Sequence, residues 1–324
     1  MASLLDTIDK RTQMVGENRL ELLLFQLDAP QRYGINVFKV KEVLQCPPLT
    51  LMPGRNPVVK GIASIRGGTL PIIDLQMAMG LAPQEGLERR FIVITEYNRM
   101  IQGFLVSSVE RIINTNWEDM HPPPQGSGAD SYLTAVTEFD KRMVEVLDVE
   151  KILAEVSPRE VDVSDGLIQH EAVNELEVEH LKILIVDDSS VARNQMKRCI
   201  AQLGFEMVIK NDGRQALNYL KEMADSGEDV SKVFPVIVSD IEMPEMDGYT
   251  LTSEIRADPR LEDLFIMLHT SLSGVFNEAM IKKVGANDFL AKFNPDDLVT
   301  KVASRISDVT GISLLGEIDE DDDE

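Results

Sequence analysis

The second half of the chain repeats one unit: a short apolar stretch ends at a polar residue and is followed by residues with helical spacing. Short apolar stretches bounded by turn signals predict buried strands, and strands that alternate with helices predict a parallel sheet covered on both faces. We therefore expect an α/β domain of the (βα)5 type over residues 181–312. The expected strands are residues 181–186, 207–209, 235–239, 264–268 and 288–291.

Polar residues follow most of these strands. Asp187 and Asp188 follow the first strand, Asp240 the third, Thr270 the fourth and Lys292 the fifth. Because the carboxyl ends of parallel strands meet at one edge of the sheet, we expect these side chains to converge. Each residue alone has a simpler explanation, since aspartate and threonine often cap helices and a lone lysine is often a surface charge. Their joint placement favours a functional site.

Clustered carboxylates repel one another, and a divalent cation removes that repulsion. Oxygen ligands beside a phosphate favour Mg²⁺. A carboxylate beside Mg²⁺ can attack a phosphoryl group and become an aspartyl phosphate. A lysine would then neutralise phosphoryl oxygens, and a threonine hydroxyl would donate a hydrogen bond to one of them. This constellation predicts a phospho-acceptor site.

The first half, residues 1–160, follows a different pattern of closely spaced short strands and turns. The glycines of Arg66-Gly67-Gly68-Thr69 predict a hairpin, because they supply the positive φ that a tight turn needs. This spacing favours an all-β barrel or sandwich. We identify no nucleophile–base pair, metal cluster or phosphate-binding loop in this part of the sequence. The expected strands are residues 22–27, 33–37, 61–65, 70–73, 91–94, 103–106 and 143–147.

Composition limits the partners and the compartment. The net charge of −23 argues against binding nucleic acid or anionic lipid through bulk charge. The sequence shows no apolar run of membrane-spanning length and no signal peptide, and its two cysteines have no metal or redox spacing, so we expect a cytoplasmic protein. Residues 161–180 are polar and predict a linker. Residues 313–324 form an acidic tail, for which a solvated disordered segment is favoured over an interaction tail.

Residues 181–310 resemble the receiver domain of two-component response regulators, which has a flavodoxin-like fold. The motifs that carry the resemblance are residues 185–189, the nine residues from Asp240 to Gly248, Thr270-Ser271 and Lys292. The resemblance implies that Asp240 is the phosphorylated residue. The other roles that it implies are Mg²⁺ binding by Asp187, Asp188, Asp240 and the backbone carbonyl of Glu242, phosphoryl contacts from Thr270 and Lys292, and a conformational switch through Thr270 and Phe289.

Two neighbours of this predicted site affect the lifetime of the phosphoryl group. Glu242 and Leu272 lie two residues after Asp240 and Thr270. An acidic and an apolar side chain at these positions are expected to position a hydrolytic water poorly. We therefore predict a long-lived phosphoryl state.

Residues 20–155 resemble the CheW coupling domain of bacterial chemotaxis. The segments that carry the resemblance are Tyr33-Gly34-Ile35, Met52-Pro53, residues 58–75 and residues 144–148. The resemblance implies two small SH3-like β-barrels that tie chemoreceptors to the histidine kinase CheA. Arg66 matches an arginine that the family uses in this coupling, whereas taken alone it would be a solvated turn residue.

A CheW-like domain followed by a receiver is the organisation of the CheV family. It implies a non-enzymatic adaptor that joins methyl-accepting chemotaxis receptors to CheA in membrane-bound arrays, without inserting into the membrane or binding nucleic acid. Phosphorylation would tune the coupling and contribute to adaptation. One alternative is a receiver that drains phosphoryl groups from CheA. A Mg²⁺-dependent phosphatase with an aspartyl nucleophile is disfavoured. Haloacid-dehalogenase-like enzymes have Asp-x-Asp after the first strand, whereas this sequence reads Asp187-Asp188-Ser189.

Overall fold

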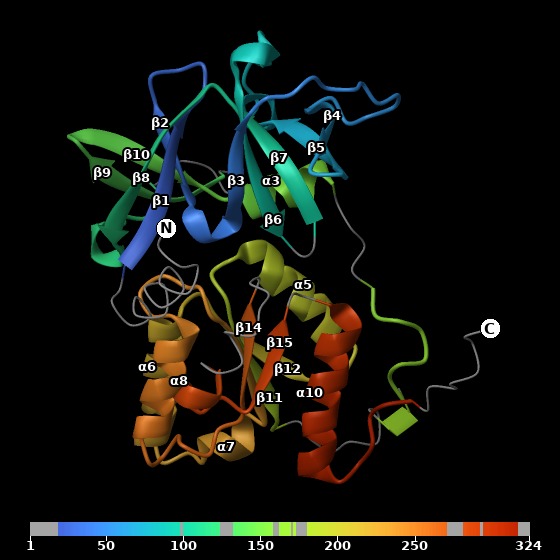
Figure 1. The fold of residues 1–324 in the computed structure, drawn as a ribbon. Helices are drawn as coiled ribbons and strands as arrows, with labels where there is room; N and C mark the ends of the chain where they lie inside the picture. The colour runs from blue at the N-terminus through green and yellow to red at the C-terminus, as the bar shows by residue number, and fades with distance from the viewer. Residues whose placement is uncertain are drawn as a thin grey trace. The chain divides into compact units, whose positions relative to one another are not determined.

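The structure, a computed structural model, describes residues 19–97, 100–123, 132–157, 162–169, 171–172, 180–270, 281–291 and 294–316. These residues form two compact units, which divide between residues 159 and 160 (Figure 1). Among the described helices, none has both the length and the apolar character needed to cross a bilayer.

The first unit holds two five-stranded sheets, with strand orders β8-β1-β2-β10-β9 and β3-β6-β7-β5-β4. Both sheets are mixed, because β10 runs parallel to β2 and β5 runs parallel to β7. The strands of the first sheet are β1 (Arg19–Gln26), β2 (Arg32–Asn36), β8 (Ser108–Asn116), β9 (Leu133–Phe139) and β10 (Arg142–Leu147). Those of the second are β3 (Val40–Gln45), β4 (Val59–Ile65), β5 (Gly68–Asp74), β6 (Phe91–Tyr97) and β7 (Met100–Val106). Short helices lie between the strands, namely η1 (Val37–Lys39), α2 (Leu75–Ala78), η2 (Leu87–Arg89) and η3 (Trp117–Asp119), and α3 (Val149–Val156) follows the last strand.

Each sheet of the first unit encloses its own apolar cluster. Leu20, Leu22 and Leu24 alternate along β1 and pack with residues of β8 and β10. Ile92 and Ile94 do the same along β6 in the second sheet. Leu23 and Phe25 of β1 and Val93 of β6 are buried as well, so both faces of these two strands are covered. The expected all-β first domain is confirmed, and its two five-stranded sheets correspond to the two small β-barrels that the resemblance implies.

The two sheets of this unit are joined by Arg90. Its Nη2 donates to Oδ2 of Asp28, which follows β1, at 2.9 Å, and its Nη1 donates to Oγ of Ser107, which follows β7, at 2.6 Å. The hydrogen bonds from Arg90, followed by that from Ser107, lower the pKa of Asp28, although partial burial opposes the shift. A bidentate arginine–carboxylate pair has a fixed geometry, so it holds the end of β1 to the start of β6.

The second unit is a parallel five-stranded sheet of order β12-β11-β13-β14-β15. Its strands are β11 (Lys182–Val186), β12 (Glu206–Lys210), β13 (Val236–Asp240), β14 (Ile266–Thr270) and β15 (Asp288–Ala291). Its helices are α5 (Ser190–Ala201), α6 (Gly213–Asp225), α7 (Val230–Val233), α8 (Gly248–Ala257) and α10 (Pro295–Thr310). In Figure 1, α6 and α8 lie on one side of the sheet and α5 and α10 on the other, and separate apolar clusters fill the two interfaces. The expected doubly covered α/β domain is confirmed.

Residues 162–169, here called the docked segment, pack against this second unit. Val163, Leu167 and Ile168 are buried in the cluster beneath α5 and α10. The segment also pairs with the end of the chain, where Gln169 N donates to the carbonyl of Leu314 at 2.9 Å. Leu314 itself is fully buried. The structure therefore places parts of the segments expected as a linker (161–180) and an acidic tail (313–324) in the core of the second unit.

Candidate functional site

Asp187 lies just beyond the carboxyl end of β11, at the edge where the sequence predicts a site. Its side chain is 2% exposed, and Oδ1 accepts a hydrogen bond from the backbone N–H of Ser189 at 2.7 Å. Ser189 in turn caps the N-terminus of α5. Arg193 donates to the carbonyl oxygen of Asp187 at 2.7 Å, which fixes the backbone as well. The carboxylate is thus held in one orientation by the turn that leads from β11 into α5.

Asp240 is the last residue of the central strand β13. Its Oδ2 accepts a hydrogen bond from the N–H of Glu242 at 3.2 Å, and its side chain is 14% exposed. The following loop returns closely over the strand end, because Gly248 N donates to the carbonyl of Ile241 at 2.9 Å. A Cβ atom at Gly248 would overlap the carbonyl oxygen of Asp240. Glycine is therefore required at the start of α8 for this loop to close.

His269 joins these two carboxylates, and the sequence analysis missed it. It lies opposite Asp240 in the pairing of β13 with β14. The imidazole is 7% exposed, and its Nδ1 lies 3.6 Å from Oδ1 of Asp240. One ligand atom from each of Asp187, Asp240 and His269 lies within 4.8 Å of the other two. Two carboxylates and an imidazole in so small a space form a group that fits a divalent cation.

Among the remaining predicted site residues of this unit, Asp188 and Phe289 are described with their side chains. Asp188 is half-buried and lies between Asp187 and the cap of α5. Phe289 is half-buried on β15 and packs against the apolar cluster shared with α6 and α8. Thr270 ends β14 and is paired with Ala291, but its side chain lies outside the described residues. Lys292 and Leu272 also lie outside them.

A buried phenol lies close to the same loop. Tyr249 follows Gly248 in α8 and is 5% exposed. Burial, reinforced by the nearby charges of Glu242 and Asp247, raises the pKa of this tyrosine to about 12. Tyr249 is therefore a neutral phenol at physiological pH and not a base.

Arg66 in the first unit occupies an exposed tight turn. Arg66 and Gly67 have φ angles of 50° and 81° and join Ile65 of β4 to Gly68 of β5. Left-handed conformation at both central residues is typical of the hairpin turn that the sequence predicts. The Arg66 side chain is 80% exposed and pairs with Glu42 of β3 at 2.7 Å. Its guanidinium is therefore accessible to a partner.

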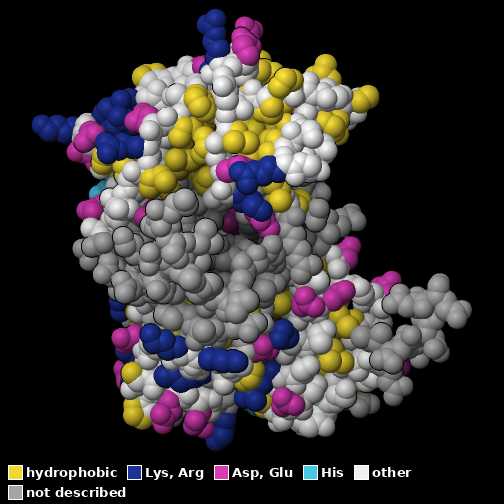
Figure 2. Space-filling model, in the orientation of Figure 1, with side chains coloured by type: hydrophobic (Ala, Val, Ile, Leu, Met, Phe, Trp, Pro, Cys, Tyr) yellow, Lys and Arg dark blue, Asp and Glu magenta, His cyan; other side chains and the backbone are white. Residues whose placement is uncertain are grey.

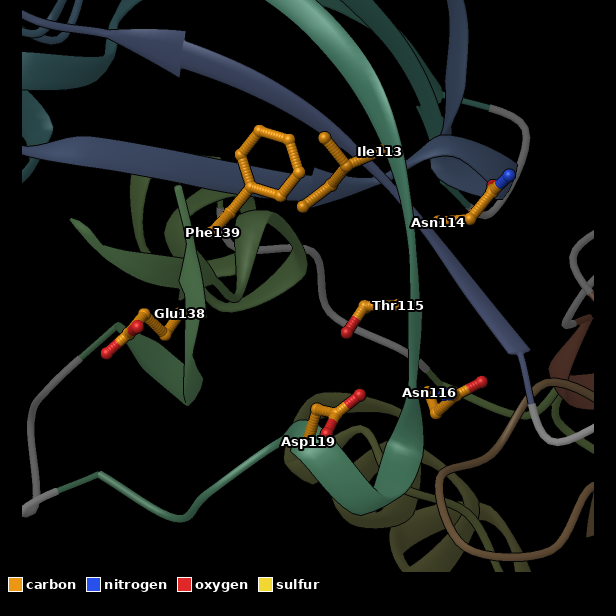
Figure 3. Close-up of a pocket in the computed structure, with 7 residues that line it drawn as sticks. All are labelled: Ile113, Asn114, Thr115, Asn116, Asp119, Glu138 and Phe139. Carbon is orange, nitrogen blue, oxygen red and sulfur yellow. The ribbon is translucent and has the colours of Figure 1, made fainter. Parts of the chain in front are cut away.

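The first unit also contains a pocket of about 360 Å³ between β8 and β9. In Figure 3, Ile113 and Phe139 lie near one end, and both belong to or contact the core of this sheet. The rest of the lining is polar or acidic, from Asn114, Thr115, Asn116, Asp119 and Glu138. None of the seven described lining residues is a histidine, a cysteine or a cation.

Comparisons with known proteins agree with this division into two units. Residues 21–157 match the CheW-like domain family, and residues 183–303 match the response regulator receiver domain family. The chain is 32% identical to chemotaxis protein CheV3 of Helicobacter pylori over 278 residues, which cover 84% of this chain and 87% of that protein. It is 30% identical to CheV1 of the same species over 322 residues, covering 92% and 97% of the two chains. A probable chemotaxis protein CheW of Rhizobium etli is 29% identical over 137 residues, covering 42% of this chain and 88% of that protein.

The fold and the site thus define a receiver domain joined to a CheW-like domain. The chain belongs to the CheV family of chemotaxis proteins. It is a chemotaxis signal-transduction adaptor with a phosphorylatable receiver, and the resemblances drawn from the sequence are confirmed.

Proposed function

We propose that the CheW-like domain links methyl-accepting chemotaxis receptors to the histidine kinase CheA, and that Mg²⁺-dependent phosphorylation of Asp240 tunes this link. The observation that carries the proposal is the position of Asp240 beside Asp187 at the carboxyl edge of the receiver sheet. The protein would act in the cytoplasm at receptor arrays, and the receiver would catalyse only its own phosphorylation and dephosphorylation.

The residues at this edge have separate tasks in the proposed reaction. Asp187, Asp188, Asp240 and the backbone carbonyl of Glu242 would hold Mg²⁺, which neutralises negative charge around the transferred group. One carboxylate oxygen of Asp240 forms a bond to phosphorus as the phosphorus–nitrogen bond of the donor phosphohistidine breaks. The departing imidazole keeps the electron pair of that bond. The hydrogen bond from Glu242 N to Oδ2 supports this role, because it orients the nucleophile before the donor arrives.

Thr270 and Lys292 would contact the phosphoryl oxygens once the group is on Asp240. Inward movement of Thr270, and of Phe289 behind it, would then shift the receiver between two conformations. Phe289 has no hydroxyl group, so this movement would act through packing and not through a hydrogen bond. Its half-buried position against the α6–α8 side of the sheet supports a packing role.

The docked segment supports a connection from the receiver to the coupling domain. Ser164 donates from its backbone N–H and its hydroxyl to the carboxylate of Asp296, at 2.8 and 2.7 Å. Asp296 lies in the first turn of α10, two residues after the helix cap Asn294. The chain that leaves the first unit is therefore attached close to the end of β15. A change at this edge of the receiver would reach the docked segment through α10.

The surface of the first unit supports its role in binding proteins. Large apolar side chains are exposed on it, and Figure 2 shows hydrophobic side chains gathered on the face seen in that view. These exposed residues are Leu51, Met52, Leu81, Ile101, Ile112 and Met143. Contiguous exposed apolar patches mark interaction sites, whereas single exposed apolar side chains are ordinary. Arg66, exposed at the β4–β5 turn, would add a charged contact.

Phosphoryl transfer from phosphorylated CheA to the full chain tests the proposal. We expect Mg²⁺-dependent labelling of the wild type, none of Asp240→Asn, and wild-type labelling of the matched control Asp263→Asn, whose side chain is exposed in the same domain. The label should persist for minutes or longer, because Glu242 and Leu272 are expected to position water poorly. Labelling that survives in Asp240→Asn would overturn the assignment of the acceptor. A phosphoryl half-life of seconds would instead favour a receiver that drains phosphoryl groups from CheA.

A further inference from the structure

His269 occupies a position from which it can bind the same ion as Asp187 and Asp240. It comes from β14 and faces Asp240 across the strand pair, with Nδ1 3.6 Å from Oδ1 of Asp240. Two ligands that each lie about 2.1 Å from one ion are separated by roughly 3–4 Å. The observed separation is therefore compatible with a shared ion and needs little movement of either side chain.

The surroundings orient these ligands. One oxygen of each carboxylate is held by a backbone N–H: Ser189 N donates to Asp187 and Glu242 N donates to Asp240. His269 is held by the strand pairing, since its carbonyl accepts a hydrogen bond from Ile241 N at 3.0 Å. Partners of this kind raise metal affinity, because they fix the ligands before the ion binds.

An imidazole changes which ion such a site prefers. Mg²⁺ favours oxygen ligands and retains several waters, whereas Zn²⁺, Co²⁺ and similar ions bind imidazole nitrogen well. We propose that Asp187, Asp240 and His269 form a site for a first-row transition-metal dication such as Zn²⁺ or Co²⁺, which binds there more tightly than Mg²⁺. This inference rests on the proposed function in one respect, because Asp187 and Asp240 bind a divalent cation in that function and in the site proposed here.

Metal titration of the full-length protein tests this site without relying on phosphorylation. Co²⁺ reports its own ligands through its visible absorption, and calorimetry with Zn²⁺ or Mg²⁺ gives the affinities. For the wild type we expect Zn²⁺ to bind at least about tenfold more tightly than Mg²⁺. For His269→Leu we expect the ratio of Zn²⁺ to Mg²⁺ affinity to fall at least about tenfold, with a changed Co²⁺ spectrum. The matched control His121→Leu removes an exposed imidazole in the other unit and should behave as the wild type.

Two outcomes would overturn the site: a wild type that binds Zn²⁺ no more tightly than Mg²⁺, and a His269→Leu protein with an unchanged affinity ratio and Co²⁺ spectrum. If His269→Leu does not fold, His269→Gln gives the same test with a side chain of similar size and polarity. Phosphoryl transfer to Asp240 in Mg²⁺ alone assesses the proposed function separately. Its absence would contradict that function, whereas an unchanged metal preference would contradict only the role of His269.

Discussion

Asp74 in the first unit and Asp240 in the second are both the last residue of a β-strand, yet their surroundings differ. Asp74 is fully buried, and its Oδ1 accepts from Met77 N at 3.1 Å. Its Oδ2 accepts from Gln84 N at 2.8 Å and pairs with Lys60 Nζ at 3.1 Å. Both oxygens thus have donors within the protein. This carboxylate caps a helix and joins three segments of the chain, which is a structural task.

Asp240 instead lies beside another carboxylate and an imidazole, within the group that it forms with Asp187 and His269. Neighbouring carboxylates repel one another, and a folded protein tolerates that arrangement where a ligand compensates for it. The comparison teaches that burial and strand-end position do not by themselves identify a functional aspartate. Among the described residues, what distinguishes the two is that a lysine pairs with Asp74, whereas a second carboxylate lies beside Asp240.

The largest expected effect on stability comes from removing the structural aspartate. Asp74→Ala leaves Lys60 and Gln84 without their shared acceptor, so we expect the first unit to lose about 3–5 kcal/mol. Asp240→Ala should leave the receiver as stable as the wild type or more stable, because it relieves repulsion. Urea unfolding followed by fluorescence of Trp117, the single tryptophan, reports the first unit, and far-UV circular dichroism reports both. Greater destabilisation by Asp240→Ala than by Asp74→Ala would reverse the comparison.

Gly248→Ala sharpens the comparison at Asp240, the proposed phospho-acceptor. The added methyl would overlap the carbonyl oxygen of Asp240, so the loop must shift, at a cost of about 1–3 kcal/mol. The rate of phosphorylation should fall as well, because the loop carries the N–H that orients Asp240. Denaturant unfolding and phosphoryl labelling measure the two effects. Ser253→Ala, at an exposed position in the same helix, should change neither.

Arg66→Ala tests whether the first unit binds receptor–kinase complexes through Arg66. The ion pair with Glu42 is largely exposed, so stability should change by less than about 0.5 kcal/mol. Affinity for receptor–kinase complexes should fall about tenfold or more, which corresponds to about 1.4 kcal/mol. Sedimentation with receptor-containing membranes and CheA measures it, and Arg89→Ala is an exposed control. Undiminished binding would remove Arg66 from the interface.

The smallest expected effect concerns Asp28 and acid. Hydrogen bonds from Arg90 lower the pKa of Asp28 in the folded state below its ordinary 3.8. The stabilisation is therefore fully present well above pH 3.8 and is lost as the pH falls through the lowered pKa. Unfolding experiments between pH 6 and pH 3 should show a shallower loss of stability for Asp28→Asn than for the wild type. If the unfolding free energy of the two proteins depends on pH in the same way, the Asp28–Arg90 pair does not contribute to stability.

Much of the fold could be predicted from the sequence because its two halves have different periods. The apolar strands of the receiver end at Asp187 and Asp240 as expected, and the topology brings these two together. Strand β8 (SVERIINTN) was not predicted, because it is an edge strand whose exposed residues interrupt the apolar pattern. The docked segment escaped prediction because only Val163, Leu167 and Ile168 are buried in an otherwise polar stretch.

His269 shows why part of the site could not be predicted. The polar residue at the very end of β14 is Thr270, and His269 precedes it within the strand. Which side chain of β14 faces Asp240 depends on the register between the two strands, and that register places His269 opposite it. A pattern within one strand does not contain this information. The preceding histidine was therefore visible in the sequence but had no assigned role.

The most direct test of the account is the affinity of the full chain for receptor–CheA complexes, measured in Mg²⁺ with and without beryllofluoride as a phosphoryl mimic. The account predicts that the mimic changes the affinity of the wild type and does not change that of Asp240→Ala. Tight binding with an affinity that beryllofluoride does not change in either protein would contradict the claim that phosphorylation of Asp240 tunes coupling.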